Sequence, residues 1–333
     1  MQTPRRAGIA GTGMYVPPRV VTNDELAKLM DTSDEWIIQR TGIRTRHHVD
    51  PGTGPADLAK EASLRALRAA GLEPRDLDAI VLASLSPHHE FPGTSAFLQG
   101  LLGISEIPAM DLRCQCTGFL YALQVGRLFV ESGQYQRVLV VGTEVHSTGI
   151  EFSTRGRDVT VIFGDGAGAV VLEPATGERG VLSVHLHTQG EFARKLWVEA
   201  PGSVFQPRIS QDLIDEGRHY PQMDGRFVFK HAVTRMPEVM QEALDQNQLK
   251  LEEVDLFLFH QANLRINEFV AEQAGIPPEK VYNNIETYGN CSAAAIPMCL
   301  DECVRQGRVP EGALVLMCGF GSGFTWGASL VRW

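Results

Sequence analysis

The sequence predicts an α/β fold built from two similar halves. Short apolar runs rich in β-branched residues alternate along the chain with helix-like stretches, which is typical of α/β proteins. Some runs, such as VLVV at 138–141, are apolar at every position, and this indicates strands buried on both faces of a sheet. Similar segments also recur in the same order in the two halves of the chain, so we expect an internal duplication.

The duplication rests on three pairs of segments. In the first pair a charged turn leads through Leu-Asp or Val-Asp into an apolar strand, and in the second a helix end and a glycine precede a strand. In the third pair a Gly-rich turn leads into a strand. We therefore expect one half at 1–177 and the other at 178–333. The pairs are LEPRDLDAIVLAS (72–84) with LKLEEVDLFLFHQ (249–261), FVESGQYQRVLVVGTE (129–144) with CVRQGRVPEGALVLMCG (303–319), and GDGAGAVVLEP (164–174) with GFGSGFTWGASLVRW (319–333).

Composition excludes several classes of protein. The 333 residues, 44% of them hydrophobic, are enough for about two buried cores. A net charge of −10 argues against a nucleic-acid partner, which needs clustered Lys and Arg. No apolar run reaches the roughly 18 to 20 residues of a membrane span, and the N-terminus is not typical of a signal peptide. Six cysteines in so long a chain are not typical of a secreted disulfide framework, so we expect a cytoplasmic protein.

The stretch DLRCQCTGFLYAL (111–123) places Cys114 and Cys116 just before an expected helix. Structural zinc sites usually space their cysteines C-x2-4-C and need two further ligands, so we expect no metal site, and a disulfide between these two residues would be strained. Cys116 stands at the expected N-terminus of the helix, where the partial positive charge lowers the pKa of a thiol. Cys114 should lie on the incoming strand or turn. An isolated cysteine is more often a small buried hydrophobe.

Other polar residues make a catalytic role for Cys116 the better interpretation. His260 follows the apolar strand LFLF, and catalytic groups in open α/β sheets lie at the carboxyl ends of strands. In the second half GNCSAAAIPMCL, beginning at Gly289, corresponds to the Cys116 turn, so a pseudo-twofold axis would bring Asn290 and Cys116 to one cleft. The Gly-rich loop GFGSGF (319–324) adds backbone amides for an oxyanion.

With these residues identified, the whole chain resembles the β-ketoacyl-acyl-carrier-protein synthase III family, condensing enzymes of the thiolase superfamily. The resemblance implies a thiolase-like duplicated fold in five αβαβα layers and an acyltransferase that performs a Claisen condensation in fatty acid biosynthesis. The motifs that carry it are DTSDEWIIQRTGI (31–43), CTGFLYAL (116–123), RGRDVTVIFGDGAGAVVL (155–172), HQANLRI (260–266), YGNCSAAAIP (288–297) and GFGSGFTWGASLVRW (319–333).

The resemblance also implies roles for individual residues. Cys116 is the acylated nucleophile, and His260 and Asn290 stabilise the enolate formed from a malonyl-type thioester. The backbone amides of Cys116 and Ser322 form the oxyanion hole. The family usually has glycine where this chain has Ser322, and a positive φ there would cost about 1 kcal/mol. The resemblance implies no metal and no cofactor, because the substrates are thioesters of coenzyme A or of acyl carrier protein.

Substrate and carrier contacts follow from the same resemblance. Trp36 and Arg155 match residues that flank the adenine of coenzyme A, and Arg40 lies in the Trp36 motif. Lys230 and Arg265 match residues that contact the acidic carrier protein.

Three further expectations concern the dimer, the docking of the carrier protein and the entrance to the site. Phe91 matches a residue that reaches across a dimer interface into the acyl pocket of the partner, so a homodimer is expected. The family often has a basic pair where this chain has Glu272 and Gln273, which weakens or reroutes carrier docking. The segment 191–220 departs most from the family pattern, and we expect it to cap the entrance.

Two alternative functions remain open at this point. One is a specialised-metabolite (polyketide) ketosynthase that joins long carrier-bound chains or condenses an acyl group with a β-keto thioester. The other is an acyltransferase to oxygen or nitrogen without decarboxylation, although His260 together with Asn290 argues against it. The first substrate discriminates between the initiating enzyme and the specialised ketosynthase, because a short acyl-CoA primer favours the initiating enzyme and inertness toward it favours the specialised one.

Overall fold

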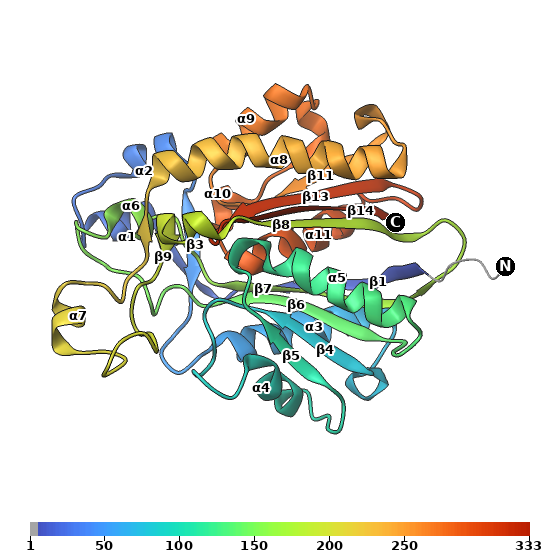
Figure 1. Cartoon of the computed structure of the whole chain (residues 1–333), viewed down its shortest axis with the longest axis horizontal. Helices are drawn as coiled ribbons and strands as arrows, with labels where there is room; N and C mark the ends of the chain where they lie inside the picture. Colours follow the sequence, from blue (N-terminus) through green and yellow to red (C-terminus); the bar gives the residue numbers. More distant parts are fainter. Residues whose placement is uncertain (1–5) are drawn as a thin grey trace.

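The computed structural model describes residues 6–333, which form two five-stranded sheets with helices between them and on both outer faces (Figure 1). The strand order is β1-β7-β6-β4-β5 in the first sheet and β12-β11-β13-β14-β8 in the second, and β2-β3 and β9-β10 form two small ribbons. The strands are β1 Arg6–Tyr15, β2 Arg19–Thr22, β3 Thr45–His48, β4 Ala79–Ala83, β5 Ala109–Leu112, β6 Val138–Glu144, β7 Gly166–Ala175, β8 Gly180–Thr188, β9 Leu196–Trp197, β10 Gln222–Met223, β11 Leu256–Phe259, β12 Val281–Tyr282, β13 Leu314–Gly321 and β14 Thr325–Arg332.

The two sheets have the same topology. Strand β6 pairs in parallel with β4 and antiparallel with β7, just as β13 pairs in parallel with β11 and antiparallel with β14. The paired segments of the sequence fall on equivalent strands, namely β4 with β11, β6 with β13 and β7 with β14. The predicted α/β fold is therefore confirmed. The expected boundary at 177/178 falls in the connection between β7 and β8.

The helices form three layers, which with the two sheets give the five layers of the thiolase-like fold. Helices α5 and α11 lie between the sheets, α3 and α4 cover the outer face of the first sheet, and α8 and α9 cover the second (Figure 1). The helices are α1 Asn23–Ala27, α2 Asp34–Thr41, α3 Pro55–Ala70, α4 Thr94–Leu101, α5 Gly118–Glu131, α6 Arg157–Thr160, α7 Gln211–Asp215, α8 Gly225–Asn247, α9 Leu264–Ala274, α10 Ile285–Tyr288 and α11 Ala295–Arg305.

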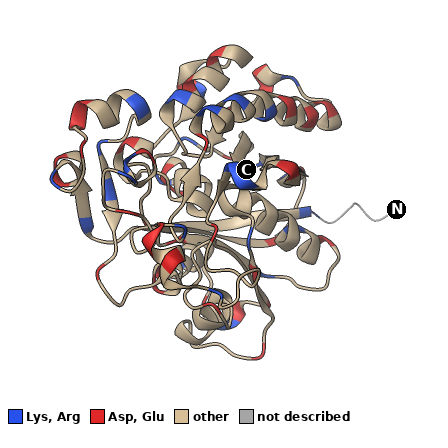
Figure 2. Ribbon diagram, turned by 60° about the vertical axis from the view of Figure 1, so that its left-hand side comes forward, with Lys and Arg blue, Asp and Glu red and all other residues tan. Residues whose placement is uncertain are grey.

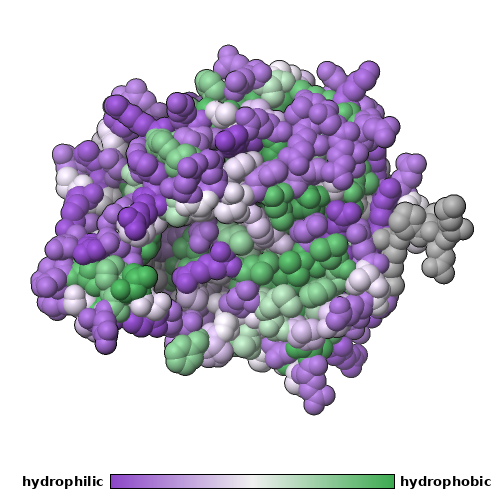
Figure 3. All heavy atoms as spheres, in the orientation of Figure 1, coloured by the Kyte–Doolittle hydropathy of each residue, from purple (hydrophilic) through white to green (hydrophobic). Residues whose placement is uncertain are grey.

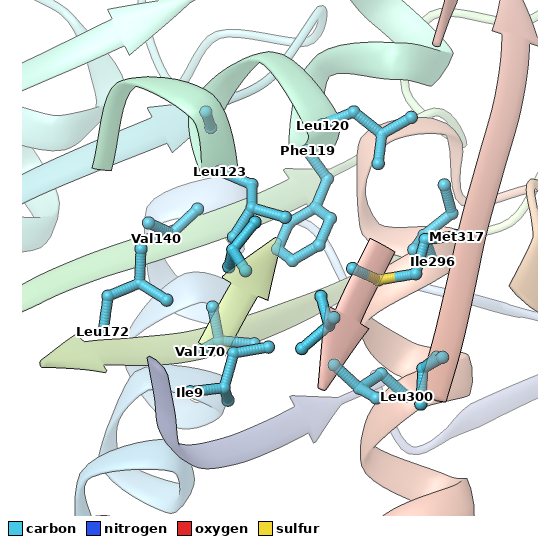
Figure 4. Close-up of a cluster of buried hydrophobic side chains, with 14 of the residues drawn as sticks. Ile9, Phe119, Leu120, Leu123, Val140, Val170, Leu172, Ile296, Leu300 and Met317 are labelled. Carbon is cyan, nitrogen blue, oxygen red and sulfur yellow. The ribbon is translucent and has the colours of Figure 1, made fainter. Parts of the chain in front are cut away.

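The central core lies between the two sheets. Phe119 and Leu120 of α5 and Ile296 and Leu300 of α11 are buried there among strand residues of both sheets (Figure 4). Burying each such side chain contributes about 1.5 to 3 kcal/mol, so the two inner helices are held firmly at their places in the fold.

Glycines bring the two halves into close backbone contact near the start of both inner helices. A Cβ atom on Gly142, at the end of β6, would lie 2.1 Å from the carbonyl oxygen of Ala293. A Cβ atom on Gly164 would lie 2.2 Å from the carbonyl oxygen of Tyr288. Only glycine permits these approaches. The N-terminal turns of α5 and α11 therefore meet at the carboxyl ends of β6 and β13.

The divergent segment 191–220 contains a 3-10 turn (Gly190–Lys195), β9 and α7, and α7 projects at the left of Figure 1. Ser322 Oγ donates a hydrogen bond to the carbonyl of Leu196, so this segment contacts the Gly-rich loop. Arg208 forms a 2.7 Å ion pair with Glu90, in the segment that carries Phe91. The helices formed by residues 6–333 include none with the length and apolar character needed to cross a bilayer.

Candidate active site

Cys116 lies at the start of the first inner helix. It occupies a 3-10 turn (Gln115–Thr117) that leads directly into α5, as the sequence predicts. Its side chain is buried, and its Sγ is within hydrogen-bonding reach of the backbone N–H groups of Cys116 itself and of Ser322. Cys114, two residues earlier, is half-buried. Of the two cysteines, Cys116 is thus the one enclosed by backbone donors.

The Gly-rich loop at the end of β13 forms the other side of the Cys116 pocket. A Cβ atom on Gly321 would lie 2.6 Å from the Cβ of Cys116 and 3.1 Å from its Sγ, so glycine is required there. Thr117 Oγ1 donates to Thr325 Oγ1 (2.8 Å), which donates to the Ser322 carbonyl (3.0 Å), and this ties the turn to the loop. Positive φ values occur at four described non-glycine residues, and Ser322 is not one of them. The serine therefore carries no left-handed strain.

The expected lowering of the Cys116 pKa is wrong. Burial raises the pKa of the Cys116 thiol to about 11, and the nearby Glu144 carboxylate raises it further. Hydrogen bonds from Ser292 and from the amides of Ser322 and Cys116 act in the opposite direction. Desolvation of the thiolate outweighs these donors. The resting thiol is therefore neutral at pH 7.

His260 immediately follows β11, as predicted. Its backbone N–H donates to the Cys318 carbonyl (2.8 Å), which holds the residue against β13. The side chain is buried, and neither ring nitrogen has a hydrogen-bond partner among the described residues. Burial, and secondarily His146, lowers the pKa of His260 to about 3. A Cβ atom on Gly319 would lie 3.3 Å from the Cβ of His260 and 3.8 Å from Cγ2 of Thr117, so His260 and the Cys116 turn both pack close to Gly319.

Asn290 lies between α10 and the second inner helix. Its backbone bridges to the first half, because its N–H donates to the Ile162 carbonyl (2.9 Å) and its carbonyl accepts from the N–H of Gly164 (3.1 Å). Its Oδ1 accepts a 2.8 Å hydrogen bond from the N–H of Ser292. With Oδ1 engaged in this way, the part of the side chain that can donate a hydrogen bond is Nδ2.

Two further residues of this site were not identified from the sequence. Ser292 Oγ donates to Cys116 Sγ at 3.6 Å. Glu144, at the end of β6, accepts hydrogen bonds from Ala293 N–H (3.4 Å) and from the segment Ser84–Ser86. Burial raises the pKa of Glu144 to about 7. Ser292 lies inside the quoted motif YGNCSAAAIP, but only the fold shows that it reaches the thiol.

Arg157, rather than Arg155, packs against the Trp36 ring. The guanidinium groups of Arg40 and Arg157 lie 4.6 and 4.9 Å from the Trp36 ring centroid. Arg155 forms a 2.9 Å ion pair with Glu151 instead. The two-residue offset arises within the motif RGRDV, where either arginine fits the sequence pattern. The sequence-based assignment of Arg155 to the Trp36 site is therefore corrected to Arg157.

The remaining predicted contact residues lie at the surface. Arg265, in the first turn of α9, donates to the Gln39 carbonyl of α2 (3.2 Å) and to Glu268 (2.9 Å), so it adjoins the helix that carries Trp36. Lys230 is exposed on α8. Phe91 is 83% exposed.

The described residues contain no group of three His, Cys, Asp or Glu side chains arranged to hold a metal ion. A cavity of about 670 Å³ opens between α1, β3 and residues 147–152, and its lining includes neither Cys116 nor His260 nor Asn290. The chemically distinctive place in the described part of the chain is therefore the buried junction of the two halves.

The duplicated five-layer fold, with the buried Cys116 at the start of its first inner helix, is typical of thiolase-fold condensing enzymes. The family model for 3-oxoacyl-[acyl-carrier-protein] synthase III matches residues 110–190, and the model for its C-terminal part matches residues 244–333. The chain belongs to the 3-oxoacyl-[acyl-carrier-protein] synthase III family, whose members are also named β-ketoacyl-[acyl-carrier-protein] synthase III, and it is an acyltransferase-type condensing enzyme.

Individual relatives agree over the full length. The chain is 44% identical to the β-ketoacyl-[acyl-carrier-protein] synthase III of Methylococcus capsulatus over 329 residues, covering 99% of both chains. The crystal structure of 3-oxoacyl-[acyl-carrier-protein] synthase III from Aquifex aeolicus superimposes with a TM-score of 0.90 at 40% identity and covers 98% of this chain and 100% of its own. The priming β-ketosynthase of the R1128 polyketide pathway also gives 0.90, at 32% identity, with 100% and 98% coverage.

Proposed function

We propose that this enzyme joins an acyl primer to a malonyl-type thioester by a decarboxylative Claisen condensation, with Cys116, His260 and Asn290 as its catalytic residues. One observation carries the proposal. The buried Cys116 thiol lies within reach of two backbone amides, those of Cys116 and Ser322, and both nitrogens of the buried His260 imidazole lack a partner among the described residues. Such preorganised donors stabilise charge that develops only during the reaction.

In the first half-reaction the Cys116 sulfur attacks the carbonyl carbon of an acyl thioester. The new C–S bond converts the carbonyl group into a tetrahedral oxyanion, and collapse of this intermediate breaks the old C–S bond. The departing thiolate takes up one proton, which balances the proton that Cys116 loses. Because the resting thiol is neutral, its deprotonation must coincide with attack, assisted by Ser292 and the two amides. The amides of Cys116 and Ser322 hold the tetrahedral oxyanion, and one such donor is typically worth about 3 kcal/mol.

In the second half-reaction the malonyl-type thioester loses CO₂. The electrons of the breaking C–C bond form an enolate, and its oxygen accepts hydrogen bonds from the His260 imidazole and Asn290 Nδ2. The α-carbon then attacks the acyl carbonyl, and collapse of the tetrahedral intermediate expels the Cys116 thiolate, which takes up a proton. Since the pKa of His260 is near 3, its neutral imidazole serves as a hydrogen-bond donor.

The substrates are thioesters of coenzyme A and of acyl carrier protein. The indole of Trp36, together with Arg40 and Arg157, is suited to stacking an adenine between a ring and guanidinium planes. Lys230 and Arg265 are candidate contacts for an acidic carrier. Acidic and basic residues are interspersed on the upper helical layer (Figure 2), so carrier docking depends on these local positive charges against an overall charge of −10.

We further propose a homodimer, divided within each chain at 177/178 into two thiolase-like halves. Strand β5 is an edge of the first sheet and is free to pair with a second copy. Apolar side chains lie on the outward face of α5, including the exposed Leu128, and an apolar strip is visible over this region in Figure 3. Phe91, on an exposed segment, is suited to reach the acyl pocket of the partner.

The proposed reaction needs no cofactor, because the thioester supplies the activated acyl group. All six cysteines are free, which agrees with a cytoplasmic location.

A second candidate function is the priming or joining of chains in polyketide biosynthesis. It is favoured by the likeness to the R1128 priming ketosynthase and by the divergent segment 191–220, which contacts Ser322 through Leu196. Its chemistry at Cys116 would be the same. The two functions differ in the first substrate.

Intact-protein mass spectrometry tests the proposal. The wild type, Cys116→Ala and the matched control Cys114→Ala are each incubated with acetyl-CoA, longer acyl-CoAs and acylated carrier proteins. We expect the wild type and Cys114→Ala to gain one acyl mass and Cys116→Ala to gain none. Rapid loading by acetyl-CoA supports the initiating enzyme, and loading only by long or carrier-bound chains supports the polyketide function. Absence of any acyl-enzyme would contradict the proposal.

A further inference from the structure

A second histidine, His146, lies in the same buried region as His260 and has no part in the proposed mechanism. It follows β6 by two residues, and its backbone N–H donates to Asp165 Oδ1 (2.7 Å). Its ring lies against the ring of Phe163, with the centroids 4.3 Å apart and the planes inclined by 30°. The residue is only 6% exposed. These contacts fix both its backbone and its ring.

The position of His146 is tied to the catalytic residues through Phe163. The backbone on either side of Phe163, at Ile162 and Gly164, makes the two hydrogen bonds that hold Asn290. His146 therefore packs on the segment 162–164 that holds Asn290 in place. It also contributes, after burial, to the lowered pKa of His260.

The imidazole of His146 carries an unmet hydrogen-bonding requirement. Its Nε2 is buried without a partner among the described residues, as are both ring nitrogens of His260. Buried polar atoms are nearly always hydrogen-bonded, and leaving one unpaired is costly. A substrate oxygen at the enolate position provides a partner for one ring nitrogen of His260. Nothing in the proposed reaction satisfies His146.

We propose that His146 binds an oxygen substituent on the acyl primer, so that hydroxyacyl thioesters are preferred as first substrates. This inference rests on the proposed function, since it assigns the primer that Cys116 accepts. A hydroxyl group suits Nε2 in either tautomer, because it both donates and accepts.

The primer is a better partner for His146 than the malonyl-type substrate. A hydrogen bond to the malonyl carboxylate would stabilise the ground state and would be lost as CO₂ departs, so it would slow decarboxylation. A hydroxyl on the primer keeps its hydrogen bond throughout the reaction.

The acylation half-reaction isolates the primer and therefore provides the test. The rates of acyl-enzyme formation, as kcat/KM, are compared for butyryl-CoA and 3-hydroxybutyryl-CoA and for the corresponding carrier-protein thioesters. The proteins are the wild type, His146→Leu, which removes the polar atoms, and His146→Gln, which keeps a donor and an acceptor. Thermal unfolding of each variant checks that it is folded.

We expect the wild type to favour the hydroxylated primer by at least about tenfold, because a site with a buried hydrogen-bonding group rejects an analogue that leaves it unpaired. His146→Leu should remove this preference, and His146→Gln should restore part of it. A wild type that favours butyryl-CoA overturns the inference without any variant. An unchanged ratio in His146→Leu, or an effect confined to the condensation step, also overturns it. A wild type that takes up no thioester of any kind contradicts the proposed function itself.

Discussion

Ser292 reaches across the junction of the two halves and donates its hydroxyl hydrogen to the Cys116 sulfur, with 3.6 Å between Oγ and Sγ. The contact follows from the duplication. Gln115, just before Cys116, and Ser292 both have φ of 45° and occupy equivalent turns before α5 and α11. Strained backbone of this kind is found at functional sites. The Ser292 N–H also holds Asn290 Oδ1, so one residue links the nucleophile to its asparagine partner.

Replacement of Ser292 by alanine should slow the reaction of the thiol. The hydroxyl stabilises the thiolate, and loss of a hydrogen bond to a charged group typically costs about 1.5 kcal/mol, or about one pKa unit. Alkylation of Cys116 by iodoacetamide at pH 8 should therefore be about tenfold slower in Ser292→Ala. Ser329→Ala is the matched control, because the Ser329 hydroxyl is buried without a partner in the described structure. Equal alkylation rates in Ser292→Ala and the wild type would exclude this role.

Gly321→Ala should block acylation while leaving the protein folded. The new Cβ would lie 2.6 Å from the Cβ of Cys116, so either the loop or the nucleophile must move. A displacement of the reacting atom by about 1 Å typically costs about a hundredfold in rate. Gly100→Ala is the control, because its new Cβ would meet no atom within 4 Å. The measurement is the rate of acyl-enzyme formation, and a Gly321→Ala rate within twofold of the control would contradict the prediction.

Much of the fold was predictable because its signal is local. The strands β4, β6, β11 and β13 are short apolar runs with glycines or charged turns at their ends, and the same order occurs twice in the sequence. The duplication then predicted that the Cys116 and Asn290 turns meet. No comparable pattern predicted how short the distance between the two turns is. That distance depends on glycines such as Gly142, where a side chain would clash with the backbone of the other half.

The environment of the site was less predictable because it depends on tertiary contacts. The helix N-terminus suggested a lowered pKa for Cys116, but burial of the thiol has the larger effect. Ser292 and Glu144 were recognised as site residues only once distant segments were brought together. Arg155 and Arg157 lie two residues apart in one motif, and sequence propensity does not show which of the two side chains lies against Trp36.

Loss of the Arg157 guanidinium should weaken binding of coenzyme A thioesters. A cation–π contact is worth about 0.5 to 2 kcal/mol, so Arg157→Ala should raise the KM for an acyl-CoA primer by about 2- to 30-fold. Arg155→Ala is the matched control and should have little effect, since Arg155 pairs with Glu151 at the surface. Steady-state kinetics are measured with the acyl-CoA and with the same acyl group on a carrier protein. Only the first substrate has an adenine, so an effect on both substrates would indicate a general loss of activity. A larger effect of Arg155→Ala than of Arg157→Ala would mean that Arg155, as the sequence suggested, contacts the adenine.

Ionisation of Glu144 should make the protein less stable as the pH rises from about 4.5 to 7. Burial raises the pKa of Glu144 from 4.5 to about 7, so in this window the folded protein holds a proton that the unfolded chain has released. The difference, 7 − 4.5 = 2.5 units, corresponds to at most about 3 kcal/mol. Urea unfolding at pH 5, 6 and 7 should show a fall in the free energy of unfolding of the wild type relative to Glu144→Gln, which cannot titrate. Parallel pH dependences in the two proteins would mean that Glu144 stays ionised when buried.

Removal of the His260 imidazole should separate the two half-reactions. His260→Ala should still form the acyl-enzyme, because the amides of Cys116 and Ser322 that hold the first oxyanion remain. Condensation should fall by about 10² to 10³, the usual effect of losing one donor to a developing oxyanion. Single-turnover mass spectrometry measures acylation, and release of CO₂ from a malonyl thioester measures the second step. With a pKa near 3, the imidazole is a weak base for a thiol whose pKa is about 11, so a donor role fits its environment better. If His260→Ala instead abolished acylation, the histidine would have to act as the base that deprotonates Cys116.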